Sequence, residues 1–385
     1  MFIILAFPNA RGHSLYAYDE HIRDLNITQN ISLKNLVLLG PPSSLGSFYF
    51  GPAYYYLLFP FVRLTNSALW SLPLASIFYT SLTIVVLFFV VKKWWQNTEL
   101  ALLISGLMSA SILTTQFAMY SSNPNTAPLF SLLFFYFLER LVGGTSRPVF
   151  YTFLLSLSFG IAIQLHSVPL VCLPIILFIL ILTKKLKFNP KLLFIFVVGV
   201  LLTNSPYIYY DLTHNFANTK SLFQIAAGAN NYAPLSEHVV GYIGFWITSF
   251  LSSHPFFNVP LILGNEFYIY FIGLLISLFL VFKYNVKRLR PAVVMLRTQP
   301  SVRLILKFWL LVPTVVLLLP AGALAGLRIY YYFILSPLVF IFLGLGLWNM
   351  YKNGYYLLVY CILAAYFIMQ AGQMYLYHML ISQLK

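Results

Sequence analysis

Three carboxylates close together near the N-terminus are the side chains best suited to chemistry. The chain has eight Asp and Glu among 385 residues, and Asp19, Glu20 and Asp24 fall within one short polar stretch. On a helix, Arg23 would lie one turn from Asp19, and Asp24 one turn from Glu20. Arg23 would then hold Asp19 ionised, while Glu20 and Asp24 would repel each other. This arrangement suits a general base beside a cation that binds phosphate or sugar.

An ordinary solvated helix face with surface ion pairs is the plain alternative for this cluster. In a soluble protein that alternative would be favoured. Beside a membrane, in a chain this poor in acid, charged groups are costly to keep without a use. The composition therefore favours a functional cluster.

A loop rich in glycine and proline, residues 40–52, leads into an aromatic stretch. Small residues let the backbone approach a ligand closely. Tyr49 and Tyr54 suit a bilayer interface, where the ring lies in lipid and the hydroxyl remains wet. A substrate-lining role and a plain aromatic belt both remain open.

Further candidate binding residues lie where predicted helices end or turn: Asn123, Asn125, Gln164, His166, Arg328 and Tyr330. Asn and Pro are common in turns, so the turn at 121–125 also has a purely structural explanation. A single His at a helix end is more often structural than catalytic. Arg328 could bind a lipid phosphate or extend to the headgroups. No set of metal ligands is recognisable, and Cys172 and Cys361 fall inside apolar runs.

The elements that must position these residues are membrane helices. Hydrophobic residues make up 60% of the chain and charged residues 8%, against roughly 25% charged residues in soluble domains. Many apolar runs approach the ~20 residues that cross a bilayer, and only helices satisfy their own backbone there. We predict an all-α, polytopic transmembrane helical bundle of about 10–11 spans. The predicted spans are about 68–91, 99–119, 126–142, 148–165, 167–183, 190–209, 267–283, 305–320, 329–350 and 354–377.

The distribution of Lys and Arg predicts the orientation of these spans. Most of the basic residues fall in short loops on one side, which the positive-inside rule places in the cytoplasm. Two long segments, 9–67 and 210–266, then lie outside, and short helices at the membrane interface are expected in them. The net charge of +15 follows from this rule and from contact with anionic lipids, so it does not indicate nucleic-acid binding.

Residues 1–7 are apolar but too few to span a membrane, and they lack the basic region of a signal peptide. The simplest interpretation is the outer end of a first helix whose inner part is truncated. The whole of 1–385 is predicted to be a single transmembrane domain.

Taken together, the order of the motifs resembles the GT-C superfamily of integral membrane glycosyltransferases. The nearest branch includes protein O-mannosyltransferases, aminoarabinose transferases and lipopolysaccharide-core galacturonosyltransferases. The motifs that carry the resemblance are Tyr18-Asp19-Glu20, Arg23-Asp24, Leu39-Gly40-Pro41, 46–58, Asn123-Pro124-Asn125, 160–166 and 204–216.

The resemblance implies a polyprenyl-phosphate sugar donor and a lipid, glycan or protein acceptor on the outer face of a bacterial inner membrane. In such enzymes the first outer loop carries an acidic catalytic residue. Asp19 matches that position, with Glu20 beside it. The expected substrate-binding residues are Arg23, Asp24, Tyr49, Tyr54, Asn123, Asn125, Gln164, His166, Arg328 and Tyr330.

Two other classes of function remain open. A lipid or glycan transporter or flippase would place charges near the middle of its spans, commonly within inverted repeats. The predicted spans are almost free of charge and no repeat is visible, which favours an enzyme. An inactive GT-C paralogue is the third possibility.

Overall fold

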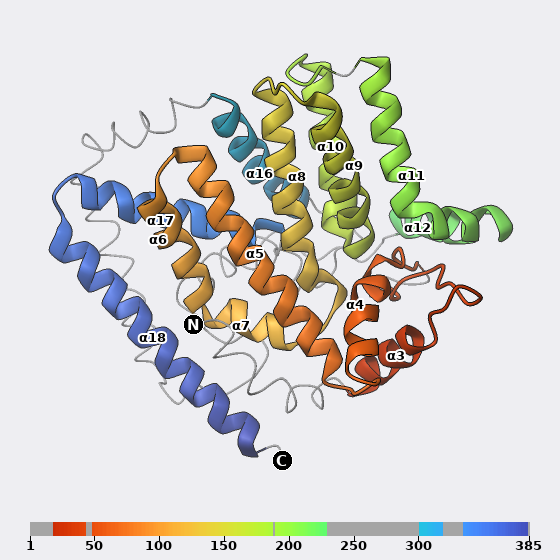
Figure 1. Ribbon diagram of the computed structural model, residues 1–385, viewed down its shortest axis with the longest axis horizontal. Helices are drawn as coiled ribbons and strands as arrows, with labels where there is room; N and C mark the ends of the chain where they lie inside the picture. Colours follow the sequence, from red (N-terminus) through yellow and green to blue (C-terminus); the bar gives the residue numbers. More distant parts are fainter. Residues whose placement is uncertain (1–17, 44–47, 188, 229–299, 319–333, 384–385) are drawn as a thin grey trace.

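The computed structural model describes residues 18–43, 48–187, 189–228, 300–318 and 334–383. Every regular element within these ranges is a helix, and β-structure is limited there to the isolated bridges Ser32–Asn35 and Pro42–Tyr49. The predicted all-α class is therefore confirmed for this part of the chain (Figure 1). The predicted span 267–283 lies outside the described residues.

The bundle is formed by helices most of which match predicted spans, with one span divided into two helices. Seven of its helices follow one another in sequence: α5 (Ser71–Trp95), α6 (Thr98–Ala110), α7 (Ile112–Met119), α8 (Ala127–Val142), α9 (Pro148–Leu165), α10 (Ser167–Leu182) and α11 (Pro190–Thr213). Towards the C-terminus come α16 (Pro300–Leu318), α17 (Ser336–Lys352) and α18 (Tyr356–Gln383). Two short helices, α3 (Tyr18–Gln29) and α4 (Ala53–Leu64), precede the bundle, and α12 (Ala217–Gly228) follows α11.

Four of these helices are individually long and apolar enough to cross a membrane, and α6 with α7 forms a possible fifth span. The chain is thus an integral membrane protein. The total of about 10–11 spans remains a prediction, as does the placement of α3 and α4 at the membrane interface.

One predicted span is not straight. We expected a continuous helix over 99–119, but α6 and α7 meet at a bend of 56°. Ser111 lies at the bend in an extended conformation, and its hydroxyl accepts the Thr114 N–H. The amide oxygen of Gln370, on α18, accepts the Ile112 N–H at 2.7 Å. The bend removes a helical hydrogen bond, and the Gln370 side chain supplies the acceptor for the Ile112 N–H instead. A buried N–H needs such a partner.

Local sequence signals fix the helix ends. The Asn97 side chain accepts from Leu100 N–H at the start of α6, and Asn189 accepts from Leu192 N–H at the start of α11. Pro190 then occupies the first turn of α11, where a missing N–H costs nothing. Lys92 and Lys93 lie in the last turn of α5, where cations interact favourably with the helix dipole.

The core of the bundle is packed with aromatic and aliphatic side chains. Phe135 of α8 stacks on Trp309 of α16 with ring centroids 4.4 Å apart. The indole N–H of Trp309 donates to the Ile334 carbonyl at 2.8 Å. At the α9–α11 contact, a Cβ on Gly199 would lie 1.8 Å from Ser156 Oγ, so the small residue lets the two backbones approach.

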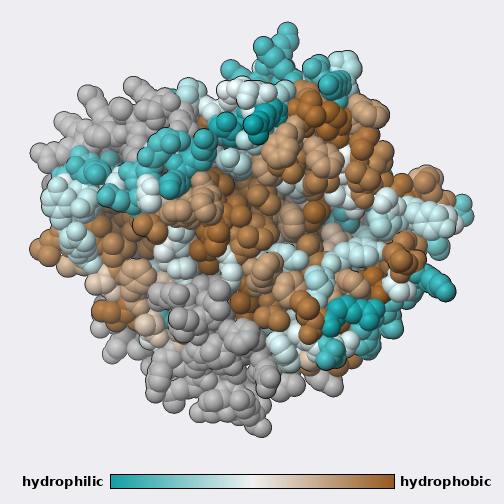
Figure 2. All heavy atoms as spheres, in the orientation of Figure 1, coloured by the Kyte–Doolittle hydropathy of each residue, from teal (hydrophilic) through white to brown (hydrophobic). Residues whose placement is uncertain are grey.

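The surface separates into an apolar middle and two polar ends. Exposed large apolar side chains are frequent on α5, α10 and α11, and Figure 2 shows hydrophobic residues across the middle of the face, with hydrophilic residues at its edges. The last turn of α5 carries basic residues, whereas α3, which carries the acidic cluster, lies beside α4 at the opposite end (Figure 1). This is the pattern expected of a protein seated in a bilayer.

Candidate functional site

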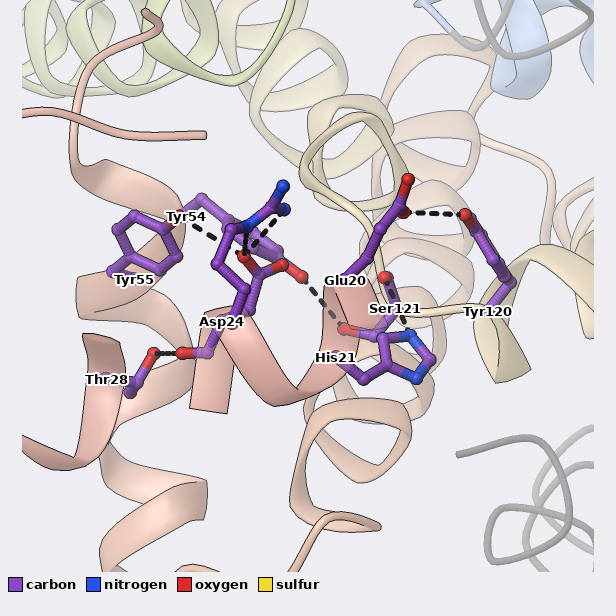
Figure 3. A network of polar contacts seen from close by, with 9 residues as sticks. Glu20, His21, Asp24, Thr28, Tyr54, Tyr55, Tyr120 and Ser121 are labelled. Atoms are coloured by element: carbon purple, nitrogen blue, oxygen red, sulfur yellow. Dashed lines mark hydrogen bonds and ion pairs between the residues drawn. The ribbon is translucent and has the colours of Figure 1, made fainter. Parts of the chain in front are cut away.

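The amphipathic helix α3 sorts the acidic cluster into exposed and buried members. His21, Asp24 and Thr28 recur at spacings of three and four residues and are buried. Asp19 and Glu20, in the first turn of the helix, are exposed. Glu20 and Asp24 therefore lie in different environments, although they are close in sequence (Figure 3).

Asp24 is the buried carboxylate, and its partners are Arg23 and Tyr55. Its Oδ1 lies 2.8 Å from Arg23 Nη2 and 2.9 Å from Arg23 Nε, and it accepts the Tyr55 hydroxyl at 3.2 Å. Burial raises the pKa of Asp24, although Arg23 and the Tyr55 hydroxyl oppose that shift. The prediction that Arg23 pairs with Asp19 is wrong, because the neighbouring Asp24 holds the guanidinium from the protein side.

A second set of contacts ties α3 to the turn after α7. The His21 ring is 3.2 Å from the Ser121 carbonyl, and the Tyr54 hydroxyl is 3.1 Å from Ser121 Oγ. Tyr120 donates its hydroxyl to Glu20 Oε2 at 3.0 Å, as Figure 3 shows. Burial raises the pKa of Tyr54 well above its usual value. Tyr54 is therefore neutral, and its role in the cluster is structural.

Asn123 and Asn125, in the 3₁₀ turn η2 (Asn123–Thr126), hold backbone carbonyls. Asn123 donates to the Leu165 carbonyl at 2.6 Å, and Asn125 donates to the carbonyls of Phe117, at 2.5 Å, and Tyr120. These amides make the turn rigid and join it to the end of α9. Their predicted role in substrate binding stays a prediction, and the donors seen here are already used.

Gln164 joins three elements at the C-terminal end of α9. Its amide N–H₂ donates to the carbonyls of Gly160 and Thr203 at 2.8 and 2.9 Å, and its oxygen accepts the Ala53 N–H at 3.2 Å. A Cβ on Gly51 would lie 2.3 Å from the Gln164 side chain, so glycine is needed there. Gln164 therefore fixes the entry into α4.

His166 is buried at the junction of α9 and α10. Its Nδ1 accepts the Val168 N–H at 3.3 Å, which caps α10, and its ring stacks on Phe50 at 6.1 Å. Burial lowers the pKa of His166 to about 3, so the ring is neutral at physiological pH. This geometry agrees with the structural alternative raised for a single His at a helix end.

The described parts of the glycine- and proline-rich loop, 40–43 and 48–52, are joined by backbone hydrogen bonds. Gly40 N–H donates to the Phe50 carbonyl at 2.7 Å, and Ser43 N–H donates to the Phe48 carbonyl at 2.8 Å. Tyr49 is 41% exposed on this loop. Its side chain is therefore open to a ligand, whereas that of Tyr54 is not.

Sequence reasoning missed Asn218, which clamps this loop. Its side-chain amide pairs with both backbone groups of Tyr49, accepting the N–H at 2.8 Å and donating to the carbonyl at 2.8 Å. Asp211 Oδ1 accepts the Asn218 N–H at 3.1 Å, and Asp211 Oδ2 accepts the Thr219 hydroxyl. A carboxylate a few residues before a helix start is a recognisable capping signal, but the contact with Tyr49 spans 169 positions.

Arg328 and Tyr330 lie outside the described residues. Within the part of the chain that the structure describes, no group of three or more His, Cys, Asp or Glu side chains could hold a metal ion. Asp19 and Glu20 are exposed carboxylates on the helix that also carries the Arg23–Asp24 ion pair. Among the described residues at this end of the bundle, this arrangement is the one best suited to acid–base chemistry.

No protein-family model and no curated protein matches the sequence. Among solved structures, the fold is similar to that of ArnT from Cupriavidus metallidurans bound to undecaprenyl phosphate, with a TM-score of 0.49 and 16% identity. The match covers 86% of this chain and 60% of the ArnT chain, so this chain spans less than two thirds of that protein. At this identity the likeness to ArnT concerns the fold alone.

Proposed function

We propose that this chain is a GT-C-type integral membrane glycosyltransferase. It moves a sugar from a polyprenyl-phosphate-linked donor to a lipid, glycan or protein acceptor, on the outer face of the membrane. The observation that carries the proposal is the division of the acidic cluster on α3. Asp19 and Glu20 are exposed, while Asp24 is buried and holds Arg23 beside them.

The transfer needs one base and one cation. The base takes the proton of the acceptor hydroxyl as its oxygen attacks the anomeric carbon, and the bond from that carbon to the phosphate oxygen breaks. The phosphate leaves with the bonding electron pair and needs a positive charge rather than a proton.

Asp19 is the best candidate for the base because the other two carboxylates are already engaged. Asp24 is 3% exposed and bonded to Arg23 and Tyr55, and Glu20 accepts the Tyr120 hydroxyl. Asp24 then serves as a positioning residue that orients Arg23. The Arg23 side chain remains 39% exposed, so part of the guanidinium is available to the departing phosphate.

A membrane assay with radiolabelled polyprenyl-phosphate sugars tests the proposal. We expect Asp19→Asn to lower turnover by at least ~100-fold, within the range that general-base catalysis supplies, with donor binding retained. Glu20→Gln should cost less. The matched control is Glu99→Gln, which neutralises an exposed carboxylate in the first turn of α6 and should leave turnover unchanged.

Two results would contradict this assignment. Full activity of Asp19→Asn at a normal protein level would remove Asp19 from the mechanism. Movement of the labelled donor across the membrane, with no transfer to any acceptor, would favour a flippase instead.

A further inference from the structure

A polar cavity of about 360 Å³ lies at the basic end of the bundle, opposite the acidic cluster. It is lined by Lys93 of α5 and Gln96 just after that helix, by Glu139 and Arg140 of α8, and by Ser301 of α16. Its volume is within the range of small-ligand sites, which is roughly 300–1,000 Å³. None of these residues takes part in the proposed transfer.

The charges in the cavity favour a phosphate group. Lys93 and Arg140 supply two cations, and the one carboxylate, Glu139 Oε1, already accepts the Ser301 hydroxyl at 2.6 Å. Among the described residues, the buried Nε of Arg140 has no hydrogen-bond partner. Arg140 lines the cavity, and its guanidinium retains donors that the described residues do not use. Phosphate oxygens are strong acceptors for Arg.

An apolar stripe on α5 leads directly to Lys93. Phe78, Leu82, Val85 and Phe89 follow one another at spacings of four, three and four residues, and each is between 37% and 60% exposed. Residues at these spacings share one helix face, and Lys93 continues the series one turn beyond Phe89. At about 1.5 Å per residue the stripe is ~16 Å long, which matches one leaflet of a hydrocarbon core ~30 Å thick.

We propose that this cavity binds the phosphate of an anionic phospholipid while an acyl chain of that lipid lies along the α5 stripe. The two features meet at Lys93, which lines the cavity and ends the stripe. Basic pockets between helices on the side with most Lys and Arg are suited to lipid phosphates. A free phosphate would satisfy the same cations but would leave the stripe unused.

Native mass spectrometry of the full-length chain in detergent, titrated with phosphatidylglycerol, tests the proposal. We expect phosphatidylglycerol to bind more tightly than phosphatidylcholine. Lys93→Gln and Arg140→Gln should each weaken phosphatidylglycerol binding by about fivefold. Glu139→Gln should bind as tightly or more tightly, since it removes a negative charge and keeps an acceptor for Ser301.

Lys92→Gln is the matched control. Lys92 has the same charge and the same height on α5, but its ammonium lies over the Phe88 ring at 5.8 Å. Phe89→Ser leaves the cavity charges intact and shortens the stripe, so it should also weaken the binding of phosphatidylglycerol. Because Arg140 also contacts the Tyr151 ring at 5.7 Å, the Arg140 variant is compared with the more exposed Lys93 variant.

Several outcomes would overturn the proposal. If Lys92→Gln weakens binding as much as Lys93→Gln, the attraction is diffuse surface charge. If inorganic phosphate displaces phosphatidylglycerol at equal concentration, or if Phe89→Ser has no effect, the site binds a free anion rather than a lipid. Equal binding of phosphatidylcholine and phosphatidylglycerol would remove the role of the cavity charges.

Discussion

At the scale of single residues, burial separates carboxylates that the sequence places side by side. Asp24 lies on the face of α3 that meets α4, whereas Asp19 and Glu20 lie in the exposed first turn. The same helix therefore supplies a carboxylate available to a substrate and a buried one that holds Arg23. In the proposed transfer, this division assigns the exposed carboxylates to acid–base chemistry and the buried one to the positioning of a cation.

The raised pKa of Asp24 predicts a pH dependence of stability. The folded protein holds this proton more tightly than the unfolded chain, whose pKa is near 3.8. The contribution of Asp24 to the free energy of unfolding therefore falls as the pH rises from about 3.8 through its raised pKa. Asp24→Asn removes this dependence.

Thermal unfolding in detergent across pH 4 to 7 measures the effect. The melting temperature of Asp24→Asn relative to wild type should rise with increasing pH. A difference that is constant with pH would contradict the pKa shift. Glu20→Gln, which changes an exposed carboxylate on the same helix, provides the control and should show little dependence.

At the scale of elements, side-chain amides fix loops at the α3 end to the bundle. Gln164 joins α4, α9 and α11, and Asn218 joins α12 to the loop segment at Tyr49. Each amide offers both a donor and an acceptor, so one side chain can satisfy two backbone groups. These contacts hold the loop in place beside α3 and α4.

Removing the Asn218 clamp should loosen the loop without unfolding the bundle. Asn218→Ala leaves both backbone groups of Tyr49 without their partner. A net loss of about 1–3 kcal/mol is expected for the two hydrogen bonds together. Hydrogen exchange of the Tyr49 amide should become about tenfold faster or more. Ser221→Ala, at an exposed site on α12, should leave this exchange rate unchanged, and an unchanged rate in Asn218→Ala would contradict the clamp.

The α9–α11 contact should be sensitive to one added methyl group. Gly199→Ala would place a Cβ 2.8 Å from the Ser156 Cβ as well as against its hydroxyl, so rotation of the serine cannot relieve the clash. We expect a loss of about 1–3 kcal/mol of stability. Gly106→Ala is the control, because its Cβ would meet nothing within 4 Å and should stabilise α6 by up to about 1 kcal/mol. Thermal unfolding of the two variants in detergent compares them, and equal stability would contradict this packing.

At the scale of the whole molecule, opposite ends carry opposite chemistry. The acidic helix α3 lies beside α4 at one end, and the basic last turn of α5 lies at the other, with the apolar helices between them (Figure 1). If the basic end faces the cytoplasm, the proposed transfer site faces outwards. The proposed transfer site and the lipid cavity would then be on different leaflets.

Cysteine labelling in intact cells tests this orientation. A Leu33→Cys substitution lies at a site that is 97% exposed between α3 and α4, and Ser146→Cys lies at an exposed site in the loop between α8 and α9. In a background without the exposed Cys361, an impermeant reagent should label position 33 and not position 146. The reverse result would invert the topology.

The sequence by itself determined most of the helices and several of their ends. Apolar runs, the capping residues Asn97 and Asn189, and Pro148 and Pro190 are local signals, so the predicted spans 148–165 and 190–209 agree closely with α9 and α11. The all-α class and the polar ends of the bundle could be predicted in the same way, because hydropathy and charge are properties of each residue type.

Only the tertiary structure decided which polar side chains are open to a ligand. Whether Arg23 pairs with Asp19 or Asp24, and whether Gln164 and His166 support the scaffold, depends on which elements pack against them. The bend between α6 and α7 depends likewise on Gln370, which is distant in sequence. Burial and hydrogen bonding are set by such long-range contacts, and the order of residues along a helix does not reveal them.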